Sequence, residues 1–233
     1  MHEDGSSVTL GAPGTTPAAA SPDQPVARMG LAQLRERYPR LAAYLAGLPS
    51  GVGSYPQCRA RIATYEHVLL NDAEERPSLA GVEDRYVQQL LVAPMRGLWV
   101  PEVLLLAGIL AVGDHYRLST EEHYEWLLER NRLLFRSVVY RAVMAFLAPE
   151  MLARKASARW SNFHQGTEFR FEHTAAHEGI AELTFPPNLF DATLVQLFGA
   201  VFVAALERAN ASSVTMTVDE VTPTAGRYRV EWR

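Results

Sequence analysis

The fold is decided by residues 168–232, which read EFRFEHTAAHEGIAELTFPPNLFDATLVQLFGAVFVAALERANASSVTMTVDEVTPTAGRYRVEW. In four segments of this stretch, apolar residues alternate with polar ones: 168–172, 182–185, 214–218 and 227–232. A period of two is typical of β-strands that bury one face and expose the other. The stretch therefore predicts two strands, a helix and two further strands that form an antiparallel sheet.

The segment between the two pairs of strands predicts an unusually apolar helix, from about Asn188 to Ala209. No charged residue occurs from Ala192 to Ala205. A helix that is apolar all round must be covered on more than one side, and one sheet covers only one side. We therefore expect a second layer to pack on the far side of this helix.

The second layer is predicted from the first 150 residues, where apolar residues recur every three or four positions. A first helix is expected at 31–48, with a break at Pro39, and a second follows the loop at 48–56 and has Cys58 in its first turn. Further helices are expected at 82–91, 101–112, 119–128 and 137–147, and Pro149 is expected to end the last of them. Ser119 and Glu122 have the spacing of a capping box, which marks a helix start.

The expected fold class is α+β, with an N-terminal helical layer at about 30–150 packed on a C-terminal antiparallel ββαββ unit at about 168–233. A single domain over 28–233 buries the apolar helices more economically than two separate domains. Residues 1–27 are mainly Gly, Ser, Thr, Pro and Ala. Because such residues bury too little surface to offset the entropy of ordering, we expect a disordered tail there.

Composition narrows the classes of function. The 233 residues carry a net charge of −4, which gives no electrostatic case for a nucleic-acid partner. The single cysteine excludes an internal disulfide and favours a reducing compartment. The N-terminus lacks the features of a secretion signal, and no apolar run has the length of a membrane span. We expect a cytoplasmic protein.

Cys58 is the first candidate for chemistry. Arg59 and Arg61 beside it, together with the helix start predicted here, would lower the pKa of the thiol and favour the thiolate. The alternative, which we favour, is a small buried hydrophobe on the face of Ile62 and Tyr65, because no histidine partner is identifiable. Arg59 and the amides of the preceding loop are a weak candidate anion site, since the loop matches no phosphate-binding motif.

Histidines supply the remaining candidates. His164 lies beside two aromatic residues in a connecting segment, where packing is favoured over catalysis. His115 and His123 flank a predicted helix start close to carboxylates, and a solvated helix terminus is the favoured explanation. His173 and His177 are four residues apart, but they lie near a hairpin tip and not on a helix, so no metal site is expected.

Two parts of the sequence resemble a known group of proteins. Ala148-Pro149-Glu150 leads through Trp160 to Gly166-Thr167 and the first hairpin, and the chain closes with a helix and a hairpin ending Arg227-Tyr228-Arg229-Val230-Glu231-Trp232. Over about 82–232 this layout resembles small bacterial α/β domains related to haem–nitric-oxide-binding and 4-vinyl-reductase-like domains, especially uncharacterised myxobacterial members. The resemblance implies a small hydrophobic ligand, or assembly and signalling, often as a dimer. The Tyr-x-Ser-x-Arg motif of the haem-binding branch is missing, so the cofactor is unknown.

Together, these features predict a non-catalytic module that binds a small hydrophobic ligand and has a regulatory or signalling role. Its pocket is expected between the C-terminal helix and the helices around Leu104 and Val143. The candidate lining and contact residues are Trp99, Trp126, Phe198, Phe202, Cys58, Arg59 and His164. Two alternatives stay open: a homo-oligomeric scaffold or protein-interaction protein that uses the apolar helix as its interface, such as a homodimer, and an enzyme of unrecognised type.

Overall fold

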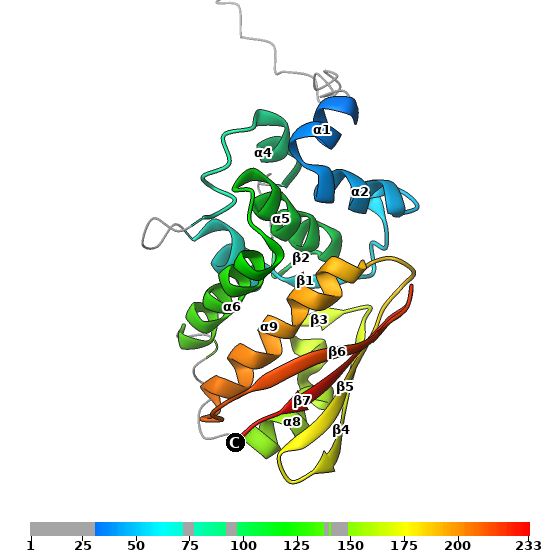
Figure 1. Ribbon diagram of the computed structural model, residues 1–233. Helices are drawn as coiled ribbons and strands as arrows, with labels where there is room; N and C mark the ends of the chain where they lie inside the picture. Colours follow the sequence, from blue (N-terminus) through cyan, green and yellow to red (C-terminus); the bar gives the residue numbers. More distant parts are fainter. Residues whose placement is uncertain (1–30, 72–76, 92–96, 138–139, 141–148) are drawn as a thin grey trace, which may run out of the picture.

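The computed structural model describes residues 31–71, 77–91, 97–137, 140 and 149–233. Figure 1 shows a helical part above a part that contains a four-stranded sheet. The helices are α1 (Leu31–Arg37), α2 (Pro39–Gly47), α3 (Ile62–Tyr65), α4 (Arg85–Leu91), α5 (Glu102–His115), α6 (Thr120–Arg136), α8 (Pro149–Arg159) and α9 (Ala192–Arg208), with short helical turns η1 (Gly51–Gly53), η2 (Glu66–Leu70) and η4 (Trp160–Asn162). The strands are β1 (Arg59–Arg61), β2 (Trp99–Pro101), β3 (His164–Gln165), β4 (Glu168–Ala175), β5 (Glu178–Thr184), β6 (Thr215–Val221) and β7 (Ala225–Glu231).

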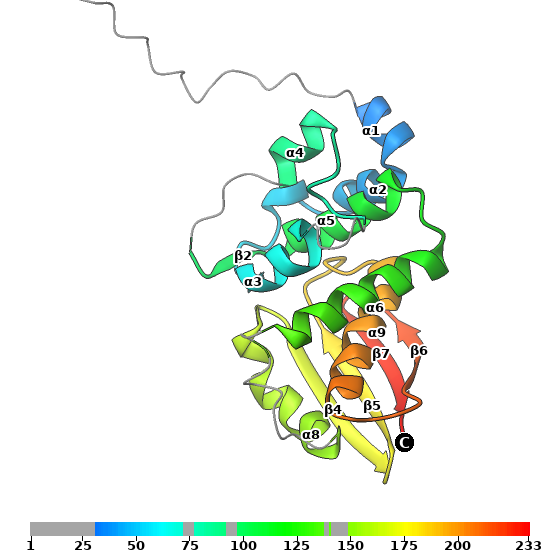
Figure 2. The same ribbon diagram turned by 90° about the vertical axis from the view of Figure 1, so that its left-hand side faces the viewer.

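The C-terminal unit has the predicted ββαββ order. Its strands pair antiparallel in the spatial order β4-β5-β7-β6. Asp191 caps α9 by accepting a hydrogen bond from the backbone N–H of Leu194 at 2.8 Å. In Figure 2, α9 lies against one face of the sheet and α6 runs along the helix. The α+β prediction and the need for a second layer over α9 are therefore confirmed.

The close approach of α9 to the sheet depends on a glycine in β7. A Cβ atom at Gly226 would lie only 2.7 Å from a methyl group of Val195 in α9. Two residues along the strand, the hydroxyl of Tyr228 donates a hydrogen bond to the Val195 carbonyl at 2.9 Å. These contacts hold α9 close to β7.

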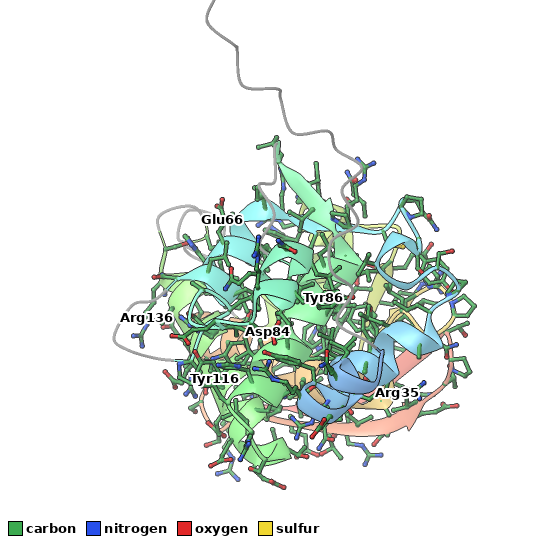
Figure 3. The ribbon with its side chains drawn as sticks, turned by 90° about the horizontal axis from the view of Figure 1, so that it is seen from above. Arg35, Glu66, Asp84, Tyr86, Tyr116 and Arg136 are labelled. Carbon is green, nitrogen blue, oxygen red and sulfur yellow. The ribbon has the colours of Figure 1, made fainter. Side chains whose placement is uncertain are left out.

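The helical layer is built around α5, of which almost every residue is buried. The capping box predicted for the next helix is present, because the Ser119 hydroxyl accepts from the Glu122 N–H at 3.2 Å and the Glu122 carboxylate accepts from the Ser119 N–H at 2.8 Å. At the top of the layer, Asp84 lies near the centre of the view in Figure 3 and forms an ion pair with Arg37 of α1 at 2.7 Å.

A small antiparallel sheet, β2-β1-β3, connects the two parts. Its strand β3 directly precedes the C-terminal unit, whereas β1 and β2 belong to the helical layer. A continuous core of buried residues runs from Leu34 in α1 to Trp232 after β7. The junction between the two parts is therefore packed and hydrogen-bonded.

One local prediction is wrong, and one helix was missed. Cys58 does not lie in a helix; it precedes the strand β1, and the helical segment starts at Ile62. Pro149 begins the helix α8, which was not predicted, in keeping with the tolerance of proline in a first helical turn. Most of the helix predicted at 137–147, with Val143, and the predicted tail at 1–27 lie outside the described residues. Among the helices that the structure describes, none combines the length and apolar character needed to cross a bilayer.

Candidate functional site

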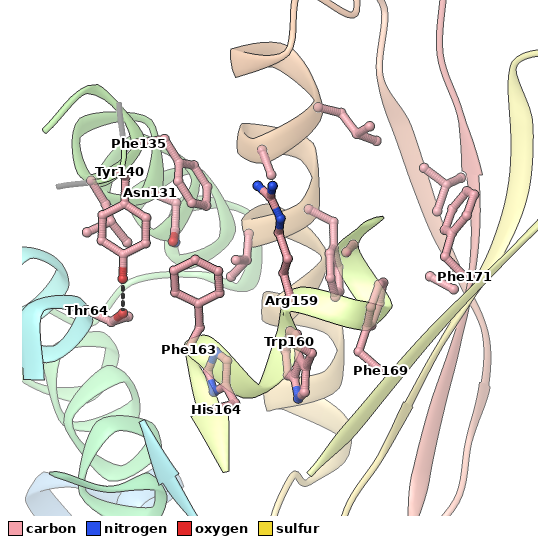
Figure 4. Close-up of a pocket in the computed structure, with 18 residues that line it drawn as sticks. Thr64, Asn131, Phe135, Tyr140, Arg159, Trp160, Phe163, His164, Phe169 and Phe171 are labelled. Carbon is pink, nitrogen blue, oxygen red and sulfur yellow. Dashed lines mark hydrogen bonds between the residues drawn. The ribbon is translucent and has the colours of Figure 1, made fainter. Parts of the chain in front are cut away.

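A cavity lies between the helical layer and the C-terminal unit, with a volume of about 140 Å³ (Figure 4). The described residues that line it come from α3, α6, α8, η4, α9 and the strands β3, β4, β5 and β7, together with Tyr140 and Phe163. Most of them are apolar, and the aromatic ones are Phe135, Tyr140, Trp160, Phe163, Phe169, Phe171 and Phe202. The cavity lies beside α9, but the described residues that line it include none from α5, the helix around Leu104, and Val143 lies outside the described residues.

Stacked rings form one wall of the cavity. Phe169 of β4 stacks on Phe202 of α9 with 4.7 Å between ring centroids, and on Trp160 of η4 at 5.3 Å. The Trp160 Nε1–H donates to the Thr167 hydroxyl at 2.9 Å, which holds the indole in place. Because these rings restrain each other, the wall presents flat and rigid apolar surface.

Polar groups are few: Thr64, Asn131 and Tyr140 lie on the side of the helical layer, and Arg159 of α8 and His164 of β3 lie on the other side. The hydroxyls of Thr64 and Tyr140 are 2.7 Å apart and share a hydrogen bond. Burial raises the pKa of Tyr140, so its phenol stays protonated at neutral pH. Asn131 of α6 is only 2% exposed, and its Nδ2 donates to the Leu127 carbonyl at 2.8 Å.

His164 of β3 also lines the cavity and is paired with a carboxylate that the sequence did not reveal. Both carboxylate oxygens of Glu102, a fully buried residue at the start of α5, lie 3.1 Å from the Nδ1 atom of His164. The carboxylate accepts from Nδ1–H, so Nε2 is a hydrogen-bond acceptor in the neutral imidazole. Trp160 stacks on the imidazole with 4.3 Å between centroids. The pair bridges the helical layer and the C-terminal unit.

Cys58 lies close to this pair. Its thiol does not have the lowered pKa that was considered for a reactive cysteine. Its side chain is fully buried, and its thiol donates to the Gly166 carbonyl at 3.3 Å. Gly166 has a φ of +75°, and a Cβ atom there would lie 2.8 Å from the Cys58 sulfur. Burial, with a further contribution from Glu102, raises the pKa of Cys58 to about 11. The thiol is therefore protonated at neutral pH.

The structure places three predicted site residues away from the cavity. Trp99 of β2 packs under the guanidinium of Arg61, 4.4 Å from its ring centroid. Trp126 points to another side of α6, where its Nε1–H donates to the Pro77 carbonyl at 2.7 Å. Arg59 is exposed, and its Nε donates to the backbone carbonyl of Pro56 at 3.1 Å.

Two aromatic residues of α9 have different surroundings. Phe202 lines the cavity, whereas Phe198, at 4% exposed, is buried one turn away against His164 and Trp160. Of the predicted residues, the structure thus brings Phe202 and His164 together in the lining, with Phe198 packed behind them. Their role as ligand contacts stays a prediction.

Three other histidines, His123, His173 and His177, pack against other parts of the protein and do not line the cavity. His123 is fully buried, unlike the solvated position expected, and its ring contacts the Ile109 carbonyl at 3.1 Å and a guanidinium nitrogen of Arg40 at 3.3 Å. Burial lowers the pKa of His123 to about 4. His173 and His177 pack edge-on against Trp232 at the far end of the sheet. Within the described ranges, no three His, Cys, Asp or Glu side chains come together as a metal site.

No protein-family model and no curated protein matches the chain. Among solved structures, the chain is similar to the Fe(II) unliganded H-NOX protein from K. algicida, with 13% identity, 74% of this chain and 96% of that chain covered, and a TM-score of 0.47. It is also similar to the H-NOX protein from S. oneidensis in the Fe(II)NO ligation state, with 12% identity, 72% and 98% covered, and a TM-score of 0.46. The H-NOX part of the resemblance noted in the sequence is thus found at low identity. The myxobacterial and 4-vinyl-reductase parts of the resemblance stay predictions.

Sequence reasoning missed Asn131, Glu102 and the phenylalanines of β4 as parts of one site. Asn131 had a usable signal, because it is an isolated amide among the leucines of an otherwise apolar helix face. Glu102 had a weaker one, as the carboxylate at the head of a helix that is otherwise apolar up to Gly113. Their convergence depends on the packing of α5, α6 and β3, which no local pattern reveals.

Proposed function

We propose that the chain is a small-molecule-binding module with a regulatory or signalling role, and that its ligand occupies the cavity beside α9. The observation that carries this proposal is an aromatic-lined cavity of about 140 Å³ that also contains Asn131 and His164. A cavity of roughly 150 Å³ accepts benzene. Small-molecule sites typically combine apolar walls with a few fixed polar groups. The ligand class that fits is a small, flat and mainly apolar molecule.

A haem does not fit this cavity. His164 has a carboxylate partner of the kind that orients metal-bound histidines. However, a porphyrin joins four pyrrole rings, whereas the described cavity, at about 140 Å³, has the size for one ring. The stacked rings of Trp160, Phe169 and Phe202 would have to separate to admit it. We therefore assign no haem-binding role to His164.

The position of the cavity supports a regulatory role. Its walls come from α3 and α6 on one side and from α8, α9 and the sheet on the other. A ligand between them adds contacts that both parts share, so it favours the arrangement in which the two parts are closed around it. Occupancy of the cavity would thereby be transmitted to the relative placement of the two parts.

The two alternatives receive less support. Helix α9 is covered by the sheet and by α6, so its apolar character is explained without a second copy of the chain. The homodimer stays a prediction. An enzyme that uses Cys58 as nucleophile would need a thiolate, and the thiol is buried and protonated.

The test combines a probe with a matched pair of variants. Toluene, as a one-ring probe, should raise the melting temperature of the full chain in a concentration-dependent way. In α8, Ala156 lines the cavity and Ala158 is exposed, so Ala156→Phe should abolish this shift and Ala158→Phe should retain it. Equal shifts in both variants, or no shift in the wild type, would contradict the proposal.

A further inference from the structure

We infer that the ligand carries a hydrogen-bond donor that is recognised by the side-chain oxygen of Asn131. This inference rests on the proposed function and names the chemistry of the ligand. It singles out one atom in the wall of the cavity as the determinant of specificity.

The orientation of the Asn131 amide is determined by its surroundings. Its Nδ2 group lies 2.8 Å from the Leu127 carbonyl, which can only accept a hydrogen bond. The nitrogen must therefore face Leu127, and Oδ1 takes the other position. Figure 4 shows this oxygen directed from α6 toward Phe163, into the space that the lining residues enclose.

The Asn131 oxygen is an acceptor that faces the cavity and has capacity for a hydrogen-bond partner. The residue is 2% exposed, and among the described residues no group donates a hydrogen bond to Oδ1. Leu127, Leu128 and Leu134 are its buried neighbours on α6, where leucine at position 131 would be compatible with both helix and core. The amide is therefore better explained by a ligand than by packing.

The remaining walls define what else the ligand must be. Stacked aromatic rings on the opposite side favour a flat molecule. Because the lining is mainly apolar and includes the cationic Arg159, a positively charged donor is disfavoured, and the donor belongs to an uncharged group, such as an amine attached to an aromatic ring, a ring N–H or a hydroxyl. The ligand class is thus a small, flat molecule with one uncharged N–H or O–H donor at its rim.

Aniline and toluene are matched probes for this inference, because they share one ring and differ in an amino group against a methyl group. Their affinities for the full-length wild type, for Asn131→Leu and for Leu134→Val are measured by calorimetry. The cost of leaving water is the same for each probe in all variants, so it cancels when the aniline-to-toluene affinity ratio is compared between variants. Loss of one hydrogen bond should lower that ratio about tenfold in Asn131→Leu. Leu134→Val, in the same wall, should weaken both probes equally and leave the ratio unchanged.

The outcomes separate this inference from the proposed function. If toluene binds and the ratio is the same in wild type and Asn131→Leu, the donor inference is overturned while the cavity remains a binding site. If neither probe binds the wild type, the proposed function fails as well. A structural role of Asn131 would appear as a lower melting temperature of the empty Asn131→Leu protein, whereas we expect an equal or higher one. If Asn131→Leu does not fold, Asn131→Met, which is unbranched and adaptable, carries the same comparison.

Discussion

Single residues show how burial and charge compete in this chain. Arg59 and Arg61 follow Cys58 closely, but Arg59 turns to the Pro56 carbonyl and Arg61 to the Asn162 carbonyl. Neither neutralises the cost of a thiolate at a fully buried position. Desolvation therefore dominates, and the pKa of Cys58 rises to about 11 where the sequence alone allowed a lower value.

This burial predicts an unreactive thiol. At pH 8, a thiol-labelling reagent should modify Cys58 in the native protein much more slowly than in the chain unfolded by guanidinium, because both accessibility and thiolate fraction are low. The labelling rates of the two states, followed by mass spectrometry, provide the check. Equal rates would show that the sulfur is accessible in the folded protein.

His123 makes folding stability depend on pH. Burial and the nearby Arg40 lower its pKa from 6.5 in the unfolded chain to about 4 in the folded protein. Below pH 6.5 the unfolded chain therefore binds more protons at this residue than the folded protein does. The free energy of unfolding decreases as the pH is lowered, until the pH reaches the pKa of His123 in the folded protein. Between pH 7 and pH 5 the loss should be about 2 kcal/mol. The buried Asp114, whose pKa is raised, acts in the opposite direction at lower pH.

Urea unfolding of the wild type and of His123→Gln at pH 7 and pH 5 isolates this contribution. The wild type should lose more stability between the two pH values than the variant does, even if the variant is less stable at both. Parallel losses in the two proteins would mean that other groups cause the pH dependence.

At the scale of elements, α6 begins at a capping box that was predicted and is present. Replacing Ser119 by alanine removes the acceptor for the Glu122 N–H and should cost about 1 kcal/mol of unfolding free energy. Ser161→Ala, at an exposed position outside this helix start, is the control and should change stability little. Denaturant unfolding measures both. A cost no larger than that of the control would show that the cap does not support the helix.

The elements also show which predictions a sequence supports. The strands β4 to β7 and helix α9 were predictable because each carries its own period and is bounded by turn residues. Strand β1 was not, since its three residues are held by pairing with β2 and β3, about 40 and 100 positions further along the chain. Helix α8 was not predicted, because the proline at its start suits the first turn of a helix as well as the position after a helix end.

At the scale of the whole molecule, the candidate site was only partly predictable. Phe202 and His164 were chosen for aromatic character and neighbouring rings, and the structure places both in the cavity lining. Trp99 and Trp126 were chosen on the same grounds but face other surfaces. Which aromatic residues meet depends on how α6 rotates against α9, and that rotation results from packing between distant segments.

The cavity joins the two parts of the molecule, so the central claim is that a small, flat molecule binds at their junction. The most direct measurement is a titration of the isotope-labelled full-length protein with toluene, followed by methyl NMR. The account predicts saturable shifts for methyl groups that line the cavity, such as those of Leu134, Val201 and Val230, while exposed Leu98 stays unchanged. Shifts confined to the surface, or none at saturating toluene, would contradict it.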